Sequence, residues 1–396
     1  MNLSPIQTLE EEPVAVPRGL VLPFDPLLLL SVIGLGAASL LTLGGATRND
    51  VPGSPHYYVE RQAIYLGVGL VLMLVISRID YSRLRELKYG IYCALIFSIV
   101  VVLGVGSSAN GSQRAINLPL FSFQGSELGK DLLIVSLSAF VVDRSRRLRE
   151  RETTARIMLL ALVPALFVIA QPDLGSGLVY VAIAFAVLFV AGCPWQHFLA
   201  LLTLGAVAIA LVLVAAPAVG VHVLKPYQTQ RLTAFLHPSS DPQEAGYQQL
   251  ESKIAIGSGG KTGRGANATQ TKLEFVPEHG TDFIFAAVGE LYGFVGASIV
   301  LSLYALLIWR ALRILTLSKN MFGTLVAGGI IAMLMFQIFV NVGMAVGIMP
   351  ITGVTLPLLS YGGSSVITIA IAVGLLQSIY LQGRSAAALK GRVLRF

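Results

Sequence analysis

One aspartate, Asp282, stands where a polar segment meets a long apolar run that begins at Phe283. Ionisable groups at a membrane boundary are costly to bury and are kept mainly where they do work. A carboxylate in this position can accept a proton from a hydroxyl group or bind a metal ion. Asp282 is therefore the first candidate for a catalytic residue. A second run, 341–365, which contains Ser360, frames the same kind of boundary.

Other ionisable residues are predicted at the same depth. Glu127 and Lys130 are three residues apart, so on a helix they share one face. Asp173 lies at the edge of another apolar run, and Glu290 lies two helical turns beyond the first candidate, Asp282. The basic residues predicted on the same side include Arg114, Arg231 and Lys253. Acids and bases from separate segments thus meet at one face, which predicts a polar, partly membrane-embedded site.

Each of these residues also has a structural interpretation. Asp282 could simply cap the following helix, as aspartate often does. Glu127 and Lys130 could form a structural ion pair, and Asp173 could be a turn residue. The glycine-rich stretch 257–265 lacks the strand-to-helix context and the spacing of a P-loop, so nucleotide binding is not expected there. The functional interpretation depends on the acids and bases meeting at one face.

The composition places these residues in a membrane protein. The chain has 396 residues, of which 55% are hydrophobic and 12% are charged, whereas soluble domains carry roughly 25% charged residues. A membrane-spanning helix needs about 20 mostly apolar residues. We therefore predict an all-α polytopic bundle of about ten transmembrane helices. The predicted spans are 26–45, 62–79, 89–107, 126–142, 156–172, 176–193, 196–216, 283–309, 322–347 and 359–382.

The orientation follows from lysine and arginine, which accumulate in cytoplasmic loops. Basic residues on one side are Arg78, Arg83, Arg85, Lys88, Arg144, Arg146, Arg147, Arg149, Arg151, Arg310, Arg313, Lys319, Arg384, Lys390, Arg392 and Arg395. The opposite short loops carry Arg48, Arg61 and Arg114. Both termini are therefore predicted in the cytoplasm. This asymmetry accounts for the net charge of +7, favours anionic membrane lipids as neighbours, and gives no indication of a nucleic-acid partner.

The predicted organisation has three parts. Residues 1–24 form a disordered cytoplasmic tail, 25–383 a polytopic membrane domain, and 384–396 a basic cytoplasmic tail. The segment 217–282 is a long extracytoplasmic loop, and apolar residues at helical spacing predict a helix over 248–256. Cys93 and Cys193 are interpreted as small core residues without a histidine partner.

Eight short segments together resemble the SEDS family (shape, elongation, division, sporulation), and within it the RodA proteins more than FtsW. They are 111–114, 124–130, 171–175, 231–236, 252–260, 277–285, 350–357 and 360–364. Their order and spacing make the resemblance specific across nearly the whole membrane part. This chain departs from the family at Gly280, where a histidine is common, which argues against a required imidazole base there.

The resemblance implies a peptidoglycan glycosyltransferase that polymerises lipid II outside the cytoplasmic membrane, beside a class B penicillin-binding protein. The family's catalytic aspartate maps onto Asp282. The cationic side chains would stabilise the leaving pyrophosphate, and Glu127 would orient Lys130 or help to hold a divalent cation. An oxygen-bound Mg²⁺ or Mn²⁺ is the ion to expect, with Asp282 or Glu127 as ligand. The segments also include Glu278 and Ser360 as supporting residues.

Two other functions are compatible with a polytopic membrane protein. A lipid II flippase or other transporter would need charged groups near the middle of the bilayer. The predicted charges lie mostly at one surface, which favours surface chemistry. A non-catalytic scaffold of the cell-wall machinery would need no converging acids.

Overall fold

The computed structural model describes residues 24–109, 112–117, 122–215, 217, 231, 235, 245–273 and 275–393. The longer helices are α1 (Pro26–Ala46), α2 (Tyr57–Arg78), α3 (Lys88–Val105), α4 (Gly125–Asp143), α5 (Arg151–Ala170), α6 (Leu174–Val190), α7 (Trp195–Ala210), α10 (Ala245–Ser258), α11 (Ile284–Leu317), α12 (Met321–Val346) and α13 (Gly363–Val393). Strands β1 (Ser107–Ala109), β2 (Ser112–Asn117) and β3 (Ser122–Phe123) form one small antiparallel sheet.

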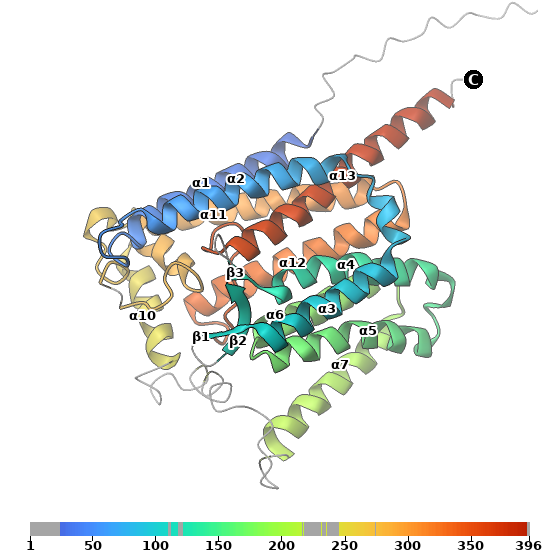
Figure 1. The fold of residues 1–396 in the computed structure, drawn as a ribbon, viewed down its shortest axis with the longest axis horizontal. Helices are drawn as coiled ribbons and strands as arrows, with labels where there is room; N and C mark the ends of the chain where they lie inside the picture. Colours follow the sequence, from blue (N-terminus) through green and yellow to red (C-terminus); the bar gives the residue numbers. More distant parts are fainter. Residues whose placement is uncertain are drawn as a thin grey trace, which may run out of the picture.

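The long helices form a bundle with a buried apolar core (Figure 1). α13 packs along α2, α1 packs along α11, and α4 packs against α3, α6 and α12. α10 and the three strands lie at one end of this bundle, and the last residues of α13 lie at the other (Figure 1). We call these the Asp282 end and the Asp143 end, after the residue two positions before α11 and the last residue of α4.

A helix covers each of the ten segments predicted to span the membrane. By length and composition, seven of these helices could cross a membrane. Two more, in α3 and α6, are apolar but shorter. The remaining one, α4, has 19 residues and carries Glu127, Lys130 and Asp131 in its first turns. The predicted helical membrane fold is therefore confirmed, with the small sheet as an addition, whereas the count of ten spans stays a prediction.

The core of the Asp143 end is fixed by a buried ion pair. Asp25, which caps α1, is fully buried and pairs with Arg310 of α11, whose Nε donates to Oδ1 at 3.1 Å. Gln377 of α13 accepts a hydrogen bond from the Asp25 backbone N–H at 2.7 Å. Three helices that are distant in sequence are joined here through one carboxylate and its backbone.

Two expectations about the chain need correction or extension. Cys93 is exposed on α3 rather than in the core, and Cys193 does have a histidine neighbour, because its Sγ lies 3.5 Å from Nδ1 of His197. α13 continues to Val393, through most of the expected basic tail. Most of the expected N-terminal tail, 1–23, and residues 394–396 lie outside the described residues.

Candidate active site

The backbone around Asp282 is held from three directions. The carbonyl of Gly280 accepts a hydrogen bond from the backbone N–H of Tyr361 at 2.9 Å. The carbonyl of Thr281 accepts from the Ser360 hydroxyl at 2.6 Å, and that of Asp282 accepts from Asn341 Nδ2 at 2.9 Å. Three consecutive carbonyl groups thus have donors from two other parts of the fold, α12 and the segment that leads into α13. Such support fixes the position of the Asp282 side chain, which a catalytic group requires.

The Asp282 carboxylate and the Arg231 guanidinium both lie close to one glycine, Gly353. A Cβ atom built on Gly353 would lie 3.4 Å from Asp282 Oδ2 and 3.8 Å from Arg231 Nη1. Gly353 also has φ +73°, a conformation that a residue with a side chain rarely adopts. The glycine therefore leaves room for an acid and a base to approach each other. The structure brings together two of the predicted site residues that are 51 positions apart in sequence.

Asp282 does not cap α11. The N-cap position of α11 is Phe283, one residue further on, and it has no side-chain capping bond. Asp282 is partly exposed, whereas the following residues of α11 are buried. Asp282 therefore lies one residue before the N-cap position, and its carboxylate remains a candidate for chemistry.

Glu127 and Lys130 form a buried ion pair in the first turns of α4. Lys130 Nζ lies 2.5 Å from Glu127 Oε1, and their side chains are 1% and 5% exposed. The predicted pairing is confirmed, and its burial makes it costly to break.

Asp173 connects this pair to the rest of the site. It caps α6 by accepting from the Ser176 backbone N–H at 3.0 Å, and its other oxygen accepts from Gln124 and Ser126, which begin α4. The first turn of α6 packs closely on the Asp282 region, since a Cβ on Gly175 would lie 2.7 Å from the carbonyl oxygen of Thr352. The first turns of α4 and α6 therefore adjoin the segment that holds Asp282.

Glu290 faces a loop instead of the other predicted site residues. It is fully buried, and its two oxygens accept hydrogen bonds from the backbone N–H groups of Thr269, Gln270 and Thr271 and from the Thr271 hydroxyl, each at 2.8 Å. Its carboxylate is thus fully engaged in holding the segment before Asp282. The position of Glu290 two turns beyond Asp282 was predictable from the sequence, but these partners were not.

The glycine-rich stretch packs backbone to backbone against α11. The N–H of Phe294 donates to Gly260 O at 2.9 Å, where Gly293 breaks the helix with φ +64°. A Cβ on Gly259 would overlap the carbonyl oxygen of Gly289. These glycines therefore allow the loop to approach α11.

Substituting Gly259 by alanine should release this loop. The added Cβ has no space, so we expect a destabilisation of about 1–3 kcal/mol and faster proteolysis between α10 and α11. Gly257→Ala is the matched control, because nothing lies within 4 Å of the atom it adds. Thermal unfolding and limited proteolysis of the purified protein measure both effects. Equal behaviour of the two variants would contradict the close packing described above.

Three other predicted residues lie around this centre. Lys253 of α10 lies over Gly347, the C-cap of α12, where a cation interacts favourably with the helix dipole. Glu278 is exposed and accepts a hydrogen bond from the Thr281 hydroxyl at 2.8 Å. Arg114 belongs to strand β2, and its side chain lies outside the described part.

Two residues that received no role from the sequence hold the site together. Asn341 donates to the Asp282 carbonyl and, at 2.7 Å, to the Val354 carbonyl, so it joins both segments of the site. Gln62 of α2 donates to Ser360 O at 3.1 Å. Both are buried amides within apolar helices, and that position was the available signal.

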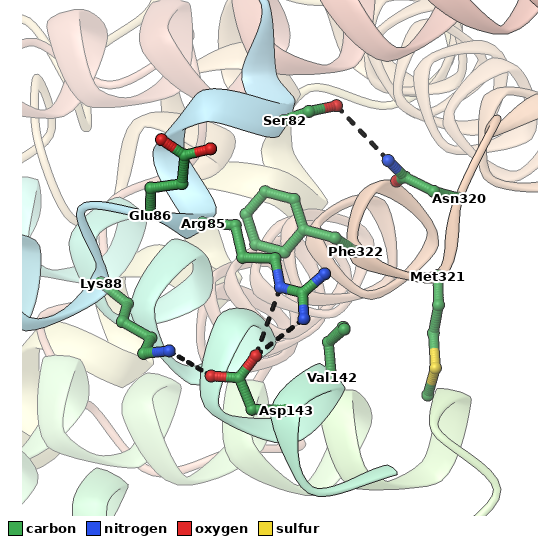
Figure 2. A pocket seen from close by; sticks show the side chains of 9 residues that line it. All are labelled: Ser82, Arg85, Glu86, Lys88, Val142, Asp143, Asn320, Met321 and Phe322. Atoms are coloured by element: carbon green, nitrogen blue, oxygen red, sulfur yellow. Dashed lines mark hydrogen bonds and ion pairs between the residues drawn. The ribbon is translucent and has the colours of Figure 1, made fainter.

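A polar pocket lies at the Asp143 end. Its volume is about 560 Å³. Figure 2 shows that Arg85 and Lys88 both point at Asp143, with which they form ion pairs, while Ser82 accepts a hydrogen bond from Asn320. Because Asp143 ends α4 and Glu127 begins it, the pocket is separated from the candidate active site by the length of a helix.

The described residues offer few ligands for a resident metal ion. Within them, no group of three or more His, Cys, Asp or Glu side chains is placed to hold one. Asp282 has the Arg231 guanidinium nearby, and Glu127 already pairs with Lys130. The side chains alone therefore do not fit the Mg²⁺ or Mn²⁺ site considered from the sequence.

The fold and the site define a polytopic α-helical membrane protein with a fixed carboxylate and several cations at one end of its bundle. The chain belongs to the FtsW/RodA/SpoVE family of cell cycle proteins, whose model matches residues 24–385. It is 37% identical to the peptidoglycan glycosyltransferase MrdB of Escherichia coli over 359 residues, which cover 90% of this chain and 93% of MrdB. It is 34% identical to the stage V sporulation protein E of Bacillus subtilis, over 82% of this chain and 87% of that protein.

Solved structures share the architecture. One chain of a peptidoglycan synthase complex superposes with a TM-score of 0.76 at 32% identity, and covers 91% of this chain and 99% of that chain. The rod shape determining protein RodA of Thermus thermophilus superposes with a TM-score of 0.63 at 29% identity, over 92% of this chain and 98% of that one. The protein is thus an integral membrane protein of the bacterial cell envelope.

Proposed function

We propose that this protein polymerises lipid II into glycan strands on the outer face of the cytoplasmic membrane, as a peptidoglycan glycosyltransferase in cell elongation and shape. The observation that supports this function best is the Asp282 carboxylate, which lies beside Arg231 at Gly353 and whose backbone is held by two other parts of the fold. Two of the relatives support it by their names, since one is the peptidoglycan glycosyltransferase MrdB and the other belongs to a peptidoglycan synthase complex.

The proposed reaction displaces a lipid-linked pyrophosphate from one sugar by a hydroxyl group of another. The new bond joins the acceptor oxygen to the anomeric carbon, and the bond from that carbon to the pyrophosphate oxygen breaks. The Asp282 carboxylate accepts the proton of the attacking hydroxyl. Arg231, which lies close to Asp282 at Gly353, is the candidate cation for the charge that develops on the pyrophosphate. A divalent Mg²⁺ or Mn²⁺, if bound, would neutralise part of the charge on the pyrophosphate, with Asp282 or Glu127 as the carboxylate that would help to hold it.

The proposed orientation places both termini in the cytoplasm and the Asp282 end outside. It is supported by the basic residues at the Asp143 end, which include Arg85, Lys88 and the 144–151 segment. A reporter that is active only outside the cytoplasm should be silent after residue 396 and active within 218–230. The reverse pattern would place the site on the wrong side of the membrane for this function.

The proposed partner is a class B penicillin-binding protein, which would cross-link the strands. A relative in the solved peptidoglycan synthase complex belongs to an assembly that coordinates polymerisation and crosslinking. The test is to incubate the purified protein with lipid II, with and without this partner, and to separate the products by length. Glycan strands that depend on this protein are expected. If strands fail to form in both conditions, the proposed function is wrong.

A further inference from the structure

A seam of buried polar side chains runs between α4 and α12, below the candidate active site. A Cβ on Gly329 of α12 would lie 2.9 Å from Ile134 Cγ2 of α4, which sets the register of these antiparallel helices. At about 1.5 Å per residue, Glu127 and Gln337 both lie roughly 10–12 Å from this contact, toward the Asp282 end. Asp131 lies between the level of the Gly329–Ile134 contact and the level of Glu127, one turn beyond Glu127. It is 3% exposed.

Several polar atoms in this seam lack a hydrogen-bond partner among the described residues. They are Oε2 of Glu127, both carboxylate oxygens of Asp131, and both polar atoms of the Gln337 amide. The Lys130 ammonium occupies the other oxygen of Glu127. Each buried polar atom that stays unpaired costs about 1–3 kcal/mol. These unpaired atoms therefore need a hydrogen-bond donor or acceptor beyond the contacts described above.

The charges of the seam are also unbalanced. Two carboxylates, Glu127 and Asp131, face one ammonium, Lys130, so with both acids ionised the group carries a net negative charge. Among the described residues, Lys130 and Glu127 are the charged groups that act on Asp131. Tyr180 of α6 also faces these acids, with its hydroxyl donating to Ser126 O at 3.1 Å. A net charge in so buried a place is costly, so one further positive charge is required.

We propose that Glu127 and Asp131 share one proton. It is bound to Asp131, whose carboxyl O–H donates a hydrogen bond to Oε2 of Glu127. The two residues are four apart on α4, so their carboxyl groups share one face of the helix. Two carboxylates at one site commonly keep one proton between them. This proton makes the group electrically neutral and gives the free oxygen of Glu127 a donor. The Gln337 amide of α12, the helix that packs against α4, also has no partner in the described part.

The shared proton deepens the proposed function and rests on it for its effect on catalysis. The substrate is an anionic pyrophosphate, which is repelled by uncompensated negative charge in a region of low dielectric constant. Loss of the proton would also divide Lys130 between two carboxylates. Asp131 is thus a positioning residue that acts through Glu127 and Lys130, and it makes polymerisation sensitive to alkaline pH.

The proton itself can be observed without any assay of activity. In the infrared spectrum of the purified full chain at neutral pH, we expect the C=O stretching band of an un-ionised carboxylic acid, although ordinary carboxyl groups, with a pKa of about 4, are then ionised. Asp131→Asn should remove this band, and Glu60→Gln, at an exposed acid of α2, should leave it. A wild-type spectrum without the band, or a band that survives in Asp131→Asn, would overturn the proposal. So would Mn²⁺ binding that depends on Asp131, since a metal ion would then supply the missing charge.

The pH profile of polymerisation tests the role of the proton. The wild-type rate should fall at alkaline pH by about tenfold per pH unit, as for a single ionisation. The rate of Asp131→Asn, whose side chain stays neutral, should remain constant over at least one pH unit of that range. If the asparagine variant does not fold, Asp131→Ser provides a second neutral side chain. Identical profiles would overturn the positioning role. Absence of glycan strands with the wild type at every pH would instead refute the proposed function and leave the infrared result standing.

Discussion

Asp282→Asn should reduce glycan polymerisation by about 10²–10⁴-fold, the usual contribution of a general base. Asparagine has the size of aspartate, so the hydrogen bonds that Gly280, Thr281 and Asp282 accept through their backbone carbonyls should remain. What disappears is the carboxylate that lies, with Arg231, close to Gly353. The measurement is the initial rate of strand formation from lipid II by variants that are reconstituted at equal concentration.

The control for this substitution is Glu60→Gln, which neutralises an exposed acid in the first turn of α2, at the same end of the bundle. Its rate should stay within about twofold of wild type, since surface substitutions usually change little. Thermal unfolding of both variants separates a catalytic loss from a folding defect. A folded Asp282→Asn protein that makes long strands at nearly the wild-type rate would remove Asp282 from the mechanism.

The helices were predictable because each depends on a local property of the chain. The expected span 26–45 is α1, Pro26–Ala46, since an apolar run of this length has few other ways to satisfy its backbone in a membrane. The strands in 107–123 were missed because two of them have only three and two residues, and the third, with the sequence SQRAIN, does not alternate between apolar and polar residues. The break at Gly293 was also missed, because that glycine lies inside a continuous apolar run.

The site was predictable only in part, because only some of its contacts depend on the local sequence. Glu127 and Lys130 are neighbours on one helix, so their spacing predicted the pair. The partners of Glu290 could not be predicted, because they come from a loop about 20 residues earlier that folds back onto α11. The approach of Asp282 to Arg231 depends on tertiary packing at Gly353, which no local pattern encodes. Side chains joined by tertiary contacts therefore required the structure.

Lys130→Met should destabilise the protein by about 3–5 kcal/mol, the usual cost of leaving one member of a buried ion pair alone. Methionine keeps the length of the side chain but leaves the Glu127 carboxylate, which is 5% exposed, without its ammonium. The double variant Glu127→Gln, Lys130→Met should be less destabilised than the sum of the single variants, because it contains no uncompensated charge at this pair. Chemical unfolding of the purified protein in detergent gives the four free energies of the cycle.

The chain contains a matched pair for comparison. Glu152 and Arg156 of α5 also form an ion pair within one helix at 2.5 Å, but their side chains are 72% and 68% exposed. Solvent screens an exposed pair, so Arg156→Met should cost at most about 1 kcal/mol, with a coupling energy near zero. The two cycles differ mainly in burial. If substitutions of Glu127 and Lys130 lowered the free energy of unfolding additively, as expected for the exposed pair, their contact would contribute no more than a surface pair. The charge balance that we propose around Asp131 would then lose its basis.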